Sequence, residues 1–180
     1  MNLEQIKQFY RDEVVFDGGM YPSHFQVINF VAGLKPQSIL EFGSAWGKNY
    51  PLLKQLLPDI QYQGIDISPH HIKIAEKQKI NVKLGDEDSL YGISNDSYDV
   101  VFTHSVLNHL PIHVVDKIVT QFKRITKHHV VAEECIEIKM DRWFIHNYSK
   151  LGYKDTGKKK WSVIIKAYYH LFHLAINAEP

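Results

Sequence analysis

The chain has 180 residues and a formal net charge of +1 with its histidines neutral. This near-neutral balance argues against a basic surface for nucleic acid or anionic membranes. The length suits one domain with a sizeable core. Cys135 is the only cysteine, which excludes an internal disulfide and a multi-cysteine metal site and favours a reducing compartment. The N-terminus lacks the apolar core of a signal peptide, and no apolar run approaches the roughly 18 residues of a membrane span. We therefore expect a cytoplasmic protein.

Two short helices are predicted at the N-terminus. Residues 3–16 carry apolar side chains at helical spacing, and a Gly-Gly pair ends that pattern. Pro22 begins a second helix, which stops near Gly33. These two helices precede the first predicted strand, so we expect them to form a cap beside the main sheet.

The middle of the chain alternates strands with helices. Short apolar runs indicate strands, and apolar stripes at helical spacing indicate helices. The run YDVVFTH is nearly unbroken in its apolar character, as expected for a parallel strand that is buried on both faces. This alternation predicts strand–helix–strand units and a parallel sheet. The predicted strands are 38–42, 62–67, 82–84, 98–104 and 129–133, and the predicted helices between and after them are 47–57, 69–79 and 112–125.

The C-terminal third has a weaker pattern. Residues 138–151 show helical spacing. Two strands, 152–156 and 161–169, are expected on either side of a lysine-rich turn at 157–160, followed by a frayed tail. The pair would be antiparallel and would complete the sheet.

The segment 38–49 (SILEFGSAWGKN) combines a strand, a turn of small residues and the start of a helix. Such a turn brings backbone N–H groups to the carboxyl edge of a parallel sheet, where ligands of open α/β folds bind. Gly43 and Gly47 allow backbone angles and close approaches that side chains would block. Glu41 ends the strand, and its carboxylate would repel a phosphate group but attract a cationic ligand. The segment therefore favours a cationic ligand over a dinucleotide.

Acidic residues also follow the next two strands. Asp66 comes roughly 20 residues after the glycine turn, where related folds place the acid that accepts hydrogen bonds from ribose hydroxyls. Its alternative role is to cap the helix that begins at Pro69, although Ser68 suits that role well. Asp86 and Glu87 follow the third strand in the sequence LGDEDSL, which taken alone indicates only a solvated acidic loop.

Taken in order, these segments resemble the motifs of class I S-adenosylmethionine-dependent methyltransferases. The family's first motif has the form (E/D)xGxGxG, and this chain has EFGSAWG, with Ala45 in place of the middle glycine. GIDIS is similar to the second motif, and residues 95–110 (NDSYDVVFTHSVLNHL) resemble the segment around the family's fourth strand. The resemblance covers residues 25–135. The alanine implies a slightly different turn.

The resemblance implies an α/β fold, a three-layer Rossmann-like sandwich. Its sheet would have seven mostly parallel strands, with an antiparallel C-terminal strand and an N-terminal helical cap. One domain would comprise the cap (1–36), a cofactor-binding core (37–135) and a C-terminal completion of the sheet (136–180). S-adenosyl-L-methionine is the implied cofactor and S-adenosyl-L-homocysteine its product. The implied cofactor-binding residues are Glu41, Phe42, Gly43, Ser44, Gly47, Asp66, Ile67, Asp86, Glu87, Thr103 and His104.

The family also suggests a role for several of these side chains. Asp66 would hold the ribose and Asp86 the exocyclic amine of adenine. Thr103 and His104 would lie beside the methionine part and the methyl group, so His104 is the candidate catalytic base or a wall of the acceptor pocket. We expect His109 to pack on the fourth strand. Tyr21 and His24 would contact the cofactor or pack within the cap.

The predicted acceptor is a small metabolite, sugar or natural product that is methylated on a hydroxyl or amine. The chain has THSV after its fourth strand, where relatives that methylate nucleic-acid or protein nitrogens carry N/D-P-P-Y/F. We therefore expect no nucleic-acid partner, and no membrane or metal site either. Two alternatives remain open: a catalytically silent accessory domain that binds S-adenosylmethionine, and an NAD-dependent oxidoreductase. The second would need a G-x-G-x-x-G turn and a hydride-transfer motif, which the sequence lacks.

Overall fold

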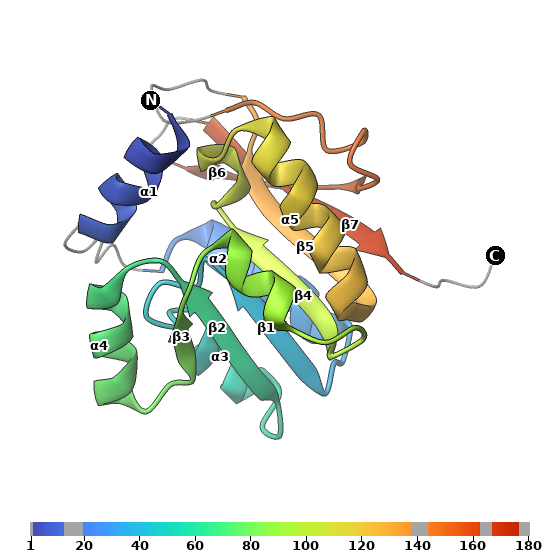
Figure 1. Ribbon diagram of the computed structural model, residues 1–180. Coiled ribbons are helices and arrows are strands. Elements are labelled where there is room, and N and C mark those ends of the chain that lie inside the picture. The colour runs from blue at the N-terminus through green and yellow to red at the C-terminus, as the bar shows by residue number, and fades with distance from the viewer. Residues whose placement is uncertain (1, 13–19, 138–143, 163–166, 177–180) are drawn as a thin grey trace.

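The computed structural model describes residues 2–12, 20–137, 144–162 and 167–176. They contain a seven-stranded sheet with the strand order β3-β2-β1-β4-β5-β7-β6 (Figure 1). The first five strands are parallel, whereas β7 is antiparallel to both of its neighbours. This arrangement confirms the predicted Rossmann-like α/β fold with an antiparallel C-terminal strand. The strands are β1 (Ser38–Phe42), β2 (Gln61–Asp66), β3 (Val82–Leu84), β4 (Tyr98–His104), β5 (Thr126–Cys135), β6 (Lys154–Ser162) and β7 (Ala167–Ala175).

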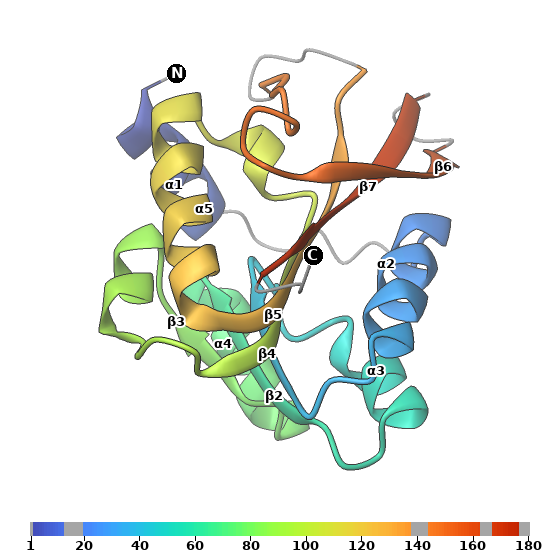
Figure 2. The same cartoon turned by 90° about the vertical axis from the view of Figure 1, so that its right-hand side faces the viewer.

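Helices cover both faces of the sheet, and Figure 2 shows the sheet between α5 on one side and α2 and α3 on the other. Side chains of α2, α3 and α4 enter one apolar cluster, and those of α5 enter a second. α1 lies beside the edge at which the parallel strands end (Figure 1). The helices are α1 (Leu3–Asp12), α2 (Pro22–Gly33), α3 (Tyr50–Leu56), α4 (Pro69–Gln78) and α5 (Ile112–Ile125), with short 3-10 helices η1 (Glu87–Gly92) and η2 (Leu107–His109).

Burial on both faces explains why the central strands are mostly apolar. Every residue of β1 is buried, and so are Val100, Val101 and Phe102 of β4. Full burial of a side chain of this size contributes roughly 1.5–3 kcal/mol. The loops at the carboxyl edge of the sheet are therefore attached to strands that buried side chains hold in place.

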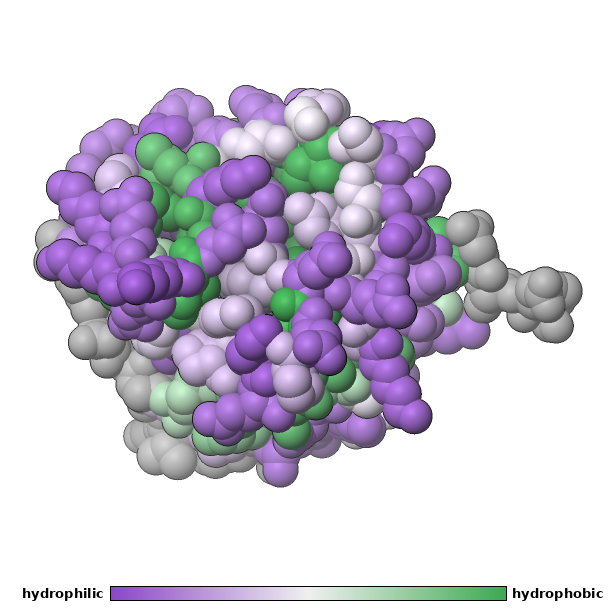
Figure 3. All heavy atoms as spheres, turned by 90° about the horizontal axis from the view of Figure 1, so that it is seen from below, coloured by the Kyte–Doolittle hydropathy of each residue, from purple (hydrophilic) through white to green (hydrophobic). Residues whose placement is uncertain are grey.

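The face of the molecule that is seen from below in Figure 3 is mostly hydrophilic, and its apolar side chains form small groups between polar ones. Within the described ranges, no helix combines the length and the apolar character needed to cross a membrane.

The helix predicted for residues 138–151 is not formed by residues 144–151, which make an irregular stretch and a turn; residues 138–143 lie outside the described part. Tertiary contacts explain the difference. His146 hydrogen-bonds two carbonyl oxygens of the loop after β4, at 3.0 and 2.9 Å, and the Tyr148 ring stacks on a β7 ring at 4.4 Å between centroids. Tyr148 and Leu151 are thus buried without a helical backbone.

The predicted turn at 157–160 is wrong, because this lysine-rich run lies inside β6. β7 continues to Ala175, beyond the predicted end of the last strand at residue 169, and the tail expected after it lies outside the described residues. β6 is an edge strand, and lysines on an edge strand discourage pairing with a second chain. A hydrophilic run can therefore be a strand at this position.

Candidate cofactor-binding site

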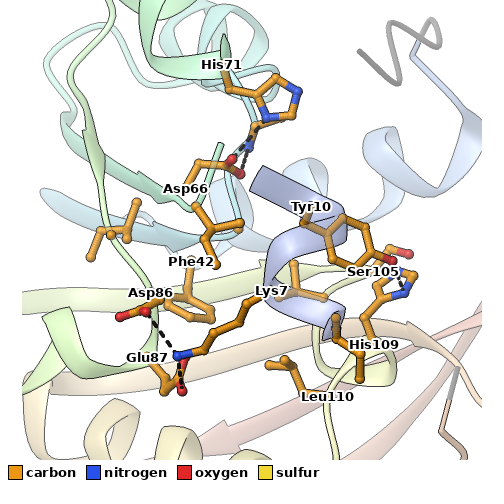
Figure 4. Close-up of a pocket in the computed structure, with 17 residues that line it drawn as sticks. Lys7, Tyr10, Phe42, Asp66, His71, Asp86, Glu87, Ser105, His109 and Leu110 are labelled. Atoms are coloured by element: carbon orange, nitrogen blue, oxygen red, sulfur yellow. Dashed lines mark hydrogen bonds and ion pairs between the residues drawn. The ribbon is translucent and has the colours of Figure 1, made fainter. Parts of the chain in front are cut away.

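A cavity of about 220 Å³ lies at the carboxyl ends of β1, β2 and β4, with α1 as one wall (Figure 4). Of the residues that the sequence predicted for the cofactor, the cavity brings together Phe42, Gly43, Asp66, Ile67, Asp86 and Glu87. The remaining lining residues are Ile6, Lys7, Tyr10, Ala45, Ile65, His71, Gly85, Ser105, Val106, His109 and Leu110.

The turn after β1 uses backbone angles that suit small residues. Gly43 has φ 73° and Gly47 has φ 80°. A Cβ on Gly43 would overlap the side chain of Val106, so only glycine lets the turn lie this close to the loop after β4. Ala45 also adopts a left-handed conformation, with φ 50°. Such an angle costs a non-glycine residue roughly 1–2 kcal/mol. The alanine is thus accommodated in the turn at this small cost.

Asp66 fastens this turn to the end of β2. One carboxylate oxygen accepts a hydrogen bond from the N–H of Ala45 at 2.7 Å. The other accepts from the N–H of Ser68 at 2.9 Å and lies 2.9 Å from Nδ1 of His71. Ser68 caps α4, as its hydroxyl accepts from the N–H of His71 at 3.4 Å. A carboxylate has about four lone-pair positions, so Asp66 keeps capacity for a ligand hydroxyl.

Lys7 of α1 reaches the acidic corner of the cavity. Its Nζ lies 3.0 Å from Asp86 and 2.7 Å from Glu87, and Arg11 lies 3.5 Å from Asp86. Burial alone would lower the pKa of Lys7, but the two carboxylates outweigh it and raise that pKa. Burial alone would raise the pKa of Asp86, but the contact with the ammonium group of Lys7 outweighs burial and lowers that pKa. The sequence reasoning missed Lys7, although a lysine on the apolar stripe of α1 was a usable signal.

The third corner of the cavity lies at the end of β4. Tyr10 and His109 form a hydrogen bond of 2.7 Å between the phenol oxygen and Nδ1. Ser105, with φ 56°, and Leu110 complete this wall. Figure 4 shows this group away from Asp66 and from the acidic corner. His109 therefore belongs to the cavity, whereas the sequence reasoning had expected it to pack on the strand.

Three predicted residues lie behind the turn and outside the cavity lining. Ser44 and Gly47 are buried there, and Glu41 is 1% exposed. The Glu41 carboxylate accepts hydrogen bonds of 2.6 Å from Asn49 and of 2.6 Å from Tyr62. Burial raises the pKa of Glu41 to about 8, against the effect of these two bonds. The carboxylate thus faces protein groups, and it holds the start of α3 to β1.

The last two predicted residues also lie outside the cavity lining. Thr103 is fully buried, and its hydroxyl has no partner among the described residues. His104 points to α2, where its Nε2 lies 3.1 Å from the hydroxyl of Ser23 and its ring 4.2 Å from that of His24. Burial and the neighbouring His24 hold the pKa of His104 well below its usual range. His24 accepts the N–H of Tyr21 at 3.1 Å, so both pack within the cap.

Residues 40–130 match a protein family described as methyltransferase domain. That match spans half of the chain, from within β1 to the middle of β5. The chain belongs to the class I methyltransferase domain family. Among curated protein sequences, none matches it.

Solved structures of methyltransferases share the fold of this domain. Magnesium protoporphyrin IX methyltransferase from Synechocystis with bound S-adenosylmethionine is 14% identical, with a TM-score of 0.70 over 97% of this chain and 96% of that one. An S-adenosylmethionine-dependent methyltransferase from Archaeoglobus fulgidus is 15% identical, with a TM-score of 0.63 over 84% of this chain and 94% of that one. A structure described for disulfide-to-thioacetal conversion in echinomycin biosynthesis is 16% identical, with a TM-score of 0.69 over 97% and 94%.

The cofactor of this methyltransferase class is S-adenosyl-L-methionine, and the cavity residues fit its chemistry. Asp66 suits a ribose, because its remaining lone-pair position can accept a hydrogen bond from a hydroxyl. Asp86 suits an exocyclic amine, and apolar side chains such as Phe42 and Val106 suit a flat ring or a methylene chain. At Gly43 a Cβ would fill the space beside Val106, so the site depends on glycine there.

Proposed function

We propose that this methyltransferase binds S-adenosyl-L-methionine in the cavity beside α1 and transfers its methyl group to a hydroxyl or amine of a small molecule. The observation that carries the proposal is the spacing of polar groups in an otherwise apolar cavity. Asp66 marks one end, Asp86 marks a second, and the Tyr10–His109 pair marks the third (Figure 4).

In this proposal the two carboxylates hold the adenosine part. Asp66 accepts a hydrogen bond from a ribose hydroxyl, with its position fixed by the N–H groups of Ala45 and Ser68. Asp86 accepts from the exocyclic amine of adenine, and the backbone of Glu87 contacts the ring. Lys7 balances the charge of the acidic pair, so the adenine corner is not left with two uncompensated carboxylates.

The turn at Gly43 and the end of β4 then enclose the methionine part. A sulfonium supplies the chemical driving force of methyl transfer, so the chain mainly has to align the acceptor with the methyl group and exclude water. The N-terminal helix supports a small acceptor, because Ile6 is 1% exposed and lines the cavity together with Lys7 and Tyr10. A helix packed this closely leaves little room for a macromolecular surface.

Isothermal titration calorimetry tests the binding step. We expect S-adenosylhomocysteine to bind the wild-type chain and Asp66→Asn to bind it about 5- to 150-fold more weakly, which corresponds to roughly 1–3 kcal/mol for lost charge-assisted hydrogen bonds. Asp59→Asn, at an exposed loop position, is the matched control and should bind like wild type. Circular dichroism of each variant checks that the fold is retained.

The same titrations separate the rival functions. Absence of binding by wild type would reject the proposal, and binding of NADH in its place would favour the oxidoreductase alternative. Tritiated methyl transfer to a panel of small hydroxyl and amine compounds then distinguishes an enzyme from an accessory domain. Binding of S-adenosylhomocysteine without transfer to any compound would favour the accessory domain.

A further inference from the structure

A tyrosine and a histidine that are 99 residues apart in sequence meet in the wall of the cavity. Tyr10 lies on α1, and His109 lies on η2, directly after β4. The phenol oxygen and Nδ1 are 2.7 Å apart, which is a short hydrogen bond. Their rings meet edge to face, with 5.1 Å between centroids. Both side chains are half-buried, so the pair faces the cavity without being sealed from it.

The position of the pair in the cavity indicates which part of the cofactor it would face. The ribose carboxylate and the acidic corner occupy the other parts of the cavity (Figure 4). The wall that remains for the reacting end of the cofactor is the one at the end of β4, where Ser105, His109 and Tyr10 lie. A group that takes a proton from the acceptor has to stand at this wall.

The other histidines at this edge of the sheet contact other protein groups. His71, which also lines the cavity, lies 2.9 Å from the carboxylate of Asp66. His104, the candidate base suggested by the sequence, lies outside the lining and is paired with the hydroxyl of Ser23. Among the described residues that line the cavity, His109 is thus the histidine at the reacting end.

We infer that Tyr10 and His109 form a proton relay that takes the proton released by the methyl acceptor. The inference rests on the proposed function and adds to it the class of acceptor: a small hydroxyl or amine compound that must lose a proton as it is methylated. Tyr10 donates its O–H to Nδ1 of His109, and the phenol oxygen accepts the acceptor's O–H or N–H.

The atoms and charges balance in one step. The acceptor oxygen or nitrogen forms a bond to the methyl carbon, the carbon–sulfur bond breaks, and its electron pair stays on sulfur. The acceptor's proton moves to the oxygen of Tyr10 while the proton of Tyr10 moves to Nδ1 of His109. The resulting imidazolium of His109 releases a proton to water, and the neutral pair is restored.

The relay exists only while α1 is in place, because its two members lie on different elements. Lys7, one turn before Tyr10, holds the same helix to Asp86 and Glu87. The helix that forms one wall of the cavity therefore also completes the relay.

Nuclear magnetic resonance of ¹⁵N-histidine-labelled protein with S-adenosylhomocysteine bound tests the relay without any acceptor. The signals of His109 are assigned by their loss in His109→Gln. We expect the Nδ1 signal to shift in Tyr10→Phe, because this variant removes the hydrogen bond between the phenol and Nδ1. An Nδ1 signal that Tyr10→Phe leaves unchanged would overturn the relay.

Methyl transfer gives the second readout, on each compound of the panel that wild type methylates. Tyr10→Phe and His109→Gln should each lower turnover about 100-fold or more, as expected for loss of general base catalysis, with S-adenosylhomocysteine affinity within about twofold of wild type. The matched controls Tyr91→Phe and His113→Gln alter exposed positions and should keep wild-type turnover. Turnover within about fivefold of wild type in either relay variant would contradict the inference.

These readouts keep the two proposals apart. Failure of wild type to bind S-adenosylhomocysteine would reject the proposed function itself. Normal binding with an Nδ1 signal that Tyr10→Phe leaves unchanged, or with undiminished turnover in Tyr10→Phe, would reject the relay and leave the proposed function standing. If wild type methylates no compound in the panel, the resonance measurement alone decides on the relay.

Discussion

Replacement of Glu133 by glutamine should stabilise the protein, and increasingly so as the pH rises. Glu133 lies near the end of β5 and is fully buried. One carboxyl oxygen accepts a hydrogen bond of 3.1 Å from Gln26, while the other has no partner among the described residues. Burial, together with the neighbouring Glu134, raises the pKa of Glu133 to about 9. The folded protein therefore holds this group protonated at neutral pH.

The magnitude follows from the difference between folded and unfolded states. The ordinary pKa of the group is 4.5, so the unfolded chain releases this proton and the folded chain retains it between about pH 4.5 and 9. The contribution of Glu133 to stability is fully present below pH 4.5 and is lost as the pH rises towards 9. Each pH unit costs about 1.4 kcal/mol, which gives a loss of roughly 3 kcal/mol at pH 7.

Urea unfolding of wild type and Glu133→Gln at about pH 6, 7 and 8, followed by circular dichroism, measures this effect. The amide is neutral at every pH and retains an oxygen for Gln26, so the variant should be more stable by about 3 kcal/mol at pH 7, and its advantage should grow by about 1.4 kcal/mol per pH unit. Glu76→Gln, at an exposed helix position, is the control and should give no such slope. A stability difference that is constant with pH, or a less stable variant, would refute the reasoning.

Three further predictions concern the cavity. Gly43→Ala places a Cβ against Val106 at a φ of 73° and should destabilise the fold by about 1–3 kcal/mol, as measured by urea unfolding; unchanged stability would mean that the turn and the loop separate easily. Lys7→Met leaves the carboxylates of Asp86 and Glu87 without their ammonium partner and should lower stability by about 1–3 kcal/mol; an equally stable variant would show that the ion pairs contribute nothing. His104→Gln should leave the affinity for S-adenosylhomocysteine within about twofold by calorimetry, because His104 lies outside the cavity lining, and a large loss would place it in the site after all.

The central fold could be predicted from the sequence because its local patterns agree with the tertiary structure. The apolar runs at 38–42 and 98–104 are strands buried on both faces, and the stripe of residues 112–125 is a helix with one buried face. The C-terminal third could not be predicted in the same way. Residues 144–151 are held by contacts with distant elements, and the lysines at 158–160 suit an edge strand as well as a turn.

The candidate site, like the fold, could be predicted from the sequence only in part. Asp66 and Asp86 could be predicted because a residue at the end of a parallel strand lies at the carboxyl edge whatever the neighbouring loops do. Lys7 and Tyr10 could not, because the face that α1 turns towards the cavity depends on how the helix docks. Glu41 also ends a strand, but its side chain points under the turn to Asn49 and Tyr62. Position along the strand was therefore predictable, and side-chain direction was not.

Three buried carboxyl groups at this edge of the sheet have raised pKa values for the same reason, and comparison of their partners indicates what each one does. Burial raises the pKa of Glu134 to about 7, yet its carboxylate accepts N–H bonds from three successive residues of the loop that leads to His109. Glu41, with a pKa of about 8, holds the start of α3 behind the glycine turn.

Each of these two acids thus lowers stability at neutral pH and in return fixes a loop that shapes the cavity. Glu133 is different, because one of its oxygens accepts a hydrogen bond from Gln26 of α2 and the other has no partner among the described residues. A neutral amide should therefore improve stability at Glu133. The same change at Glu134 would place an NH₂ group against backbone N–H groups and release the loop that carries His109.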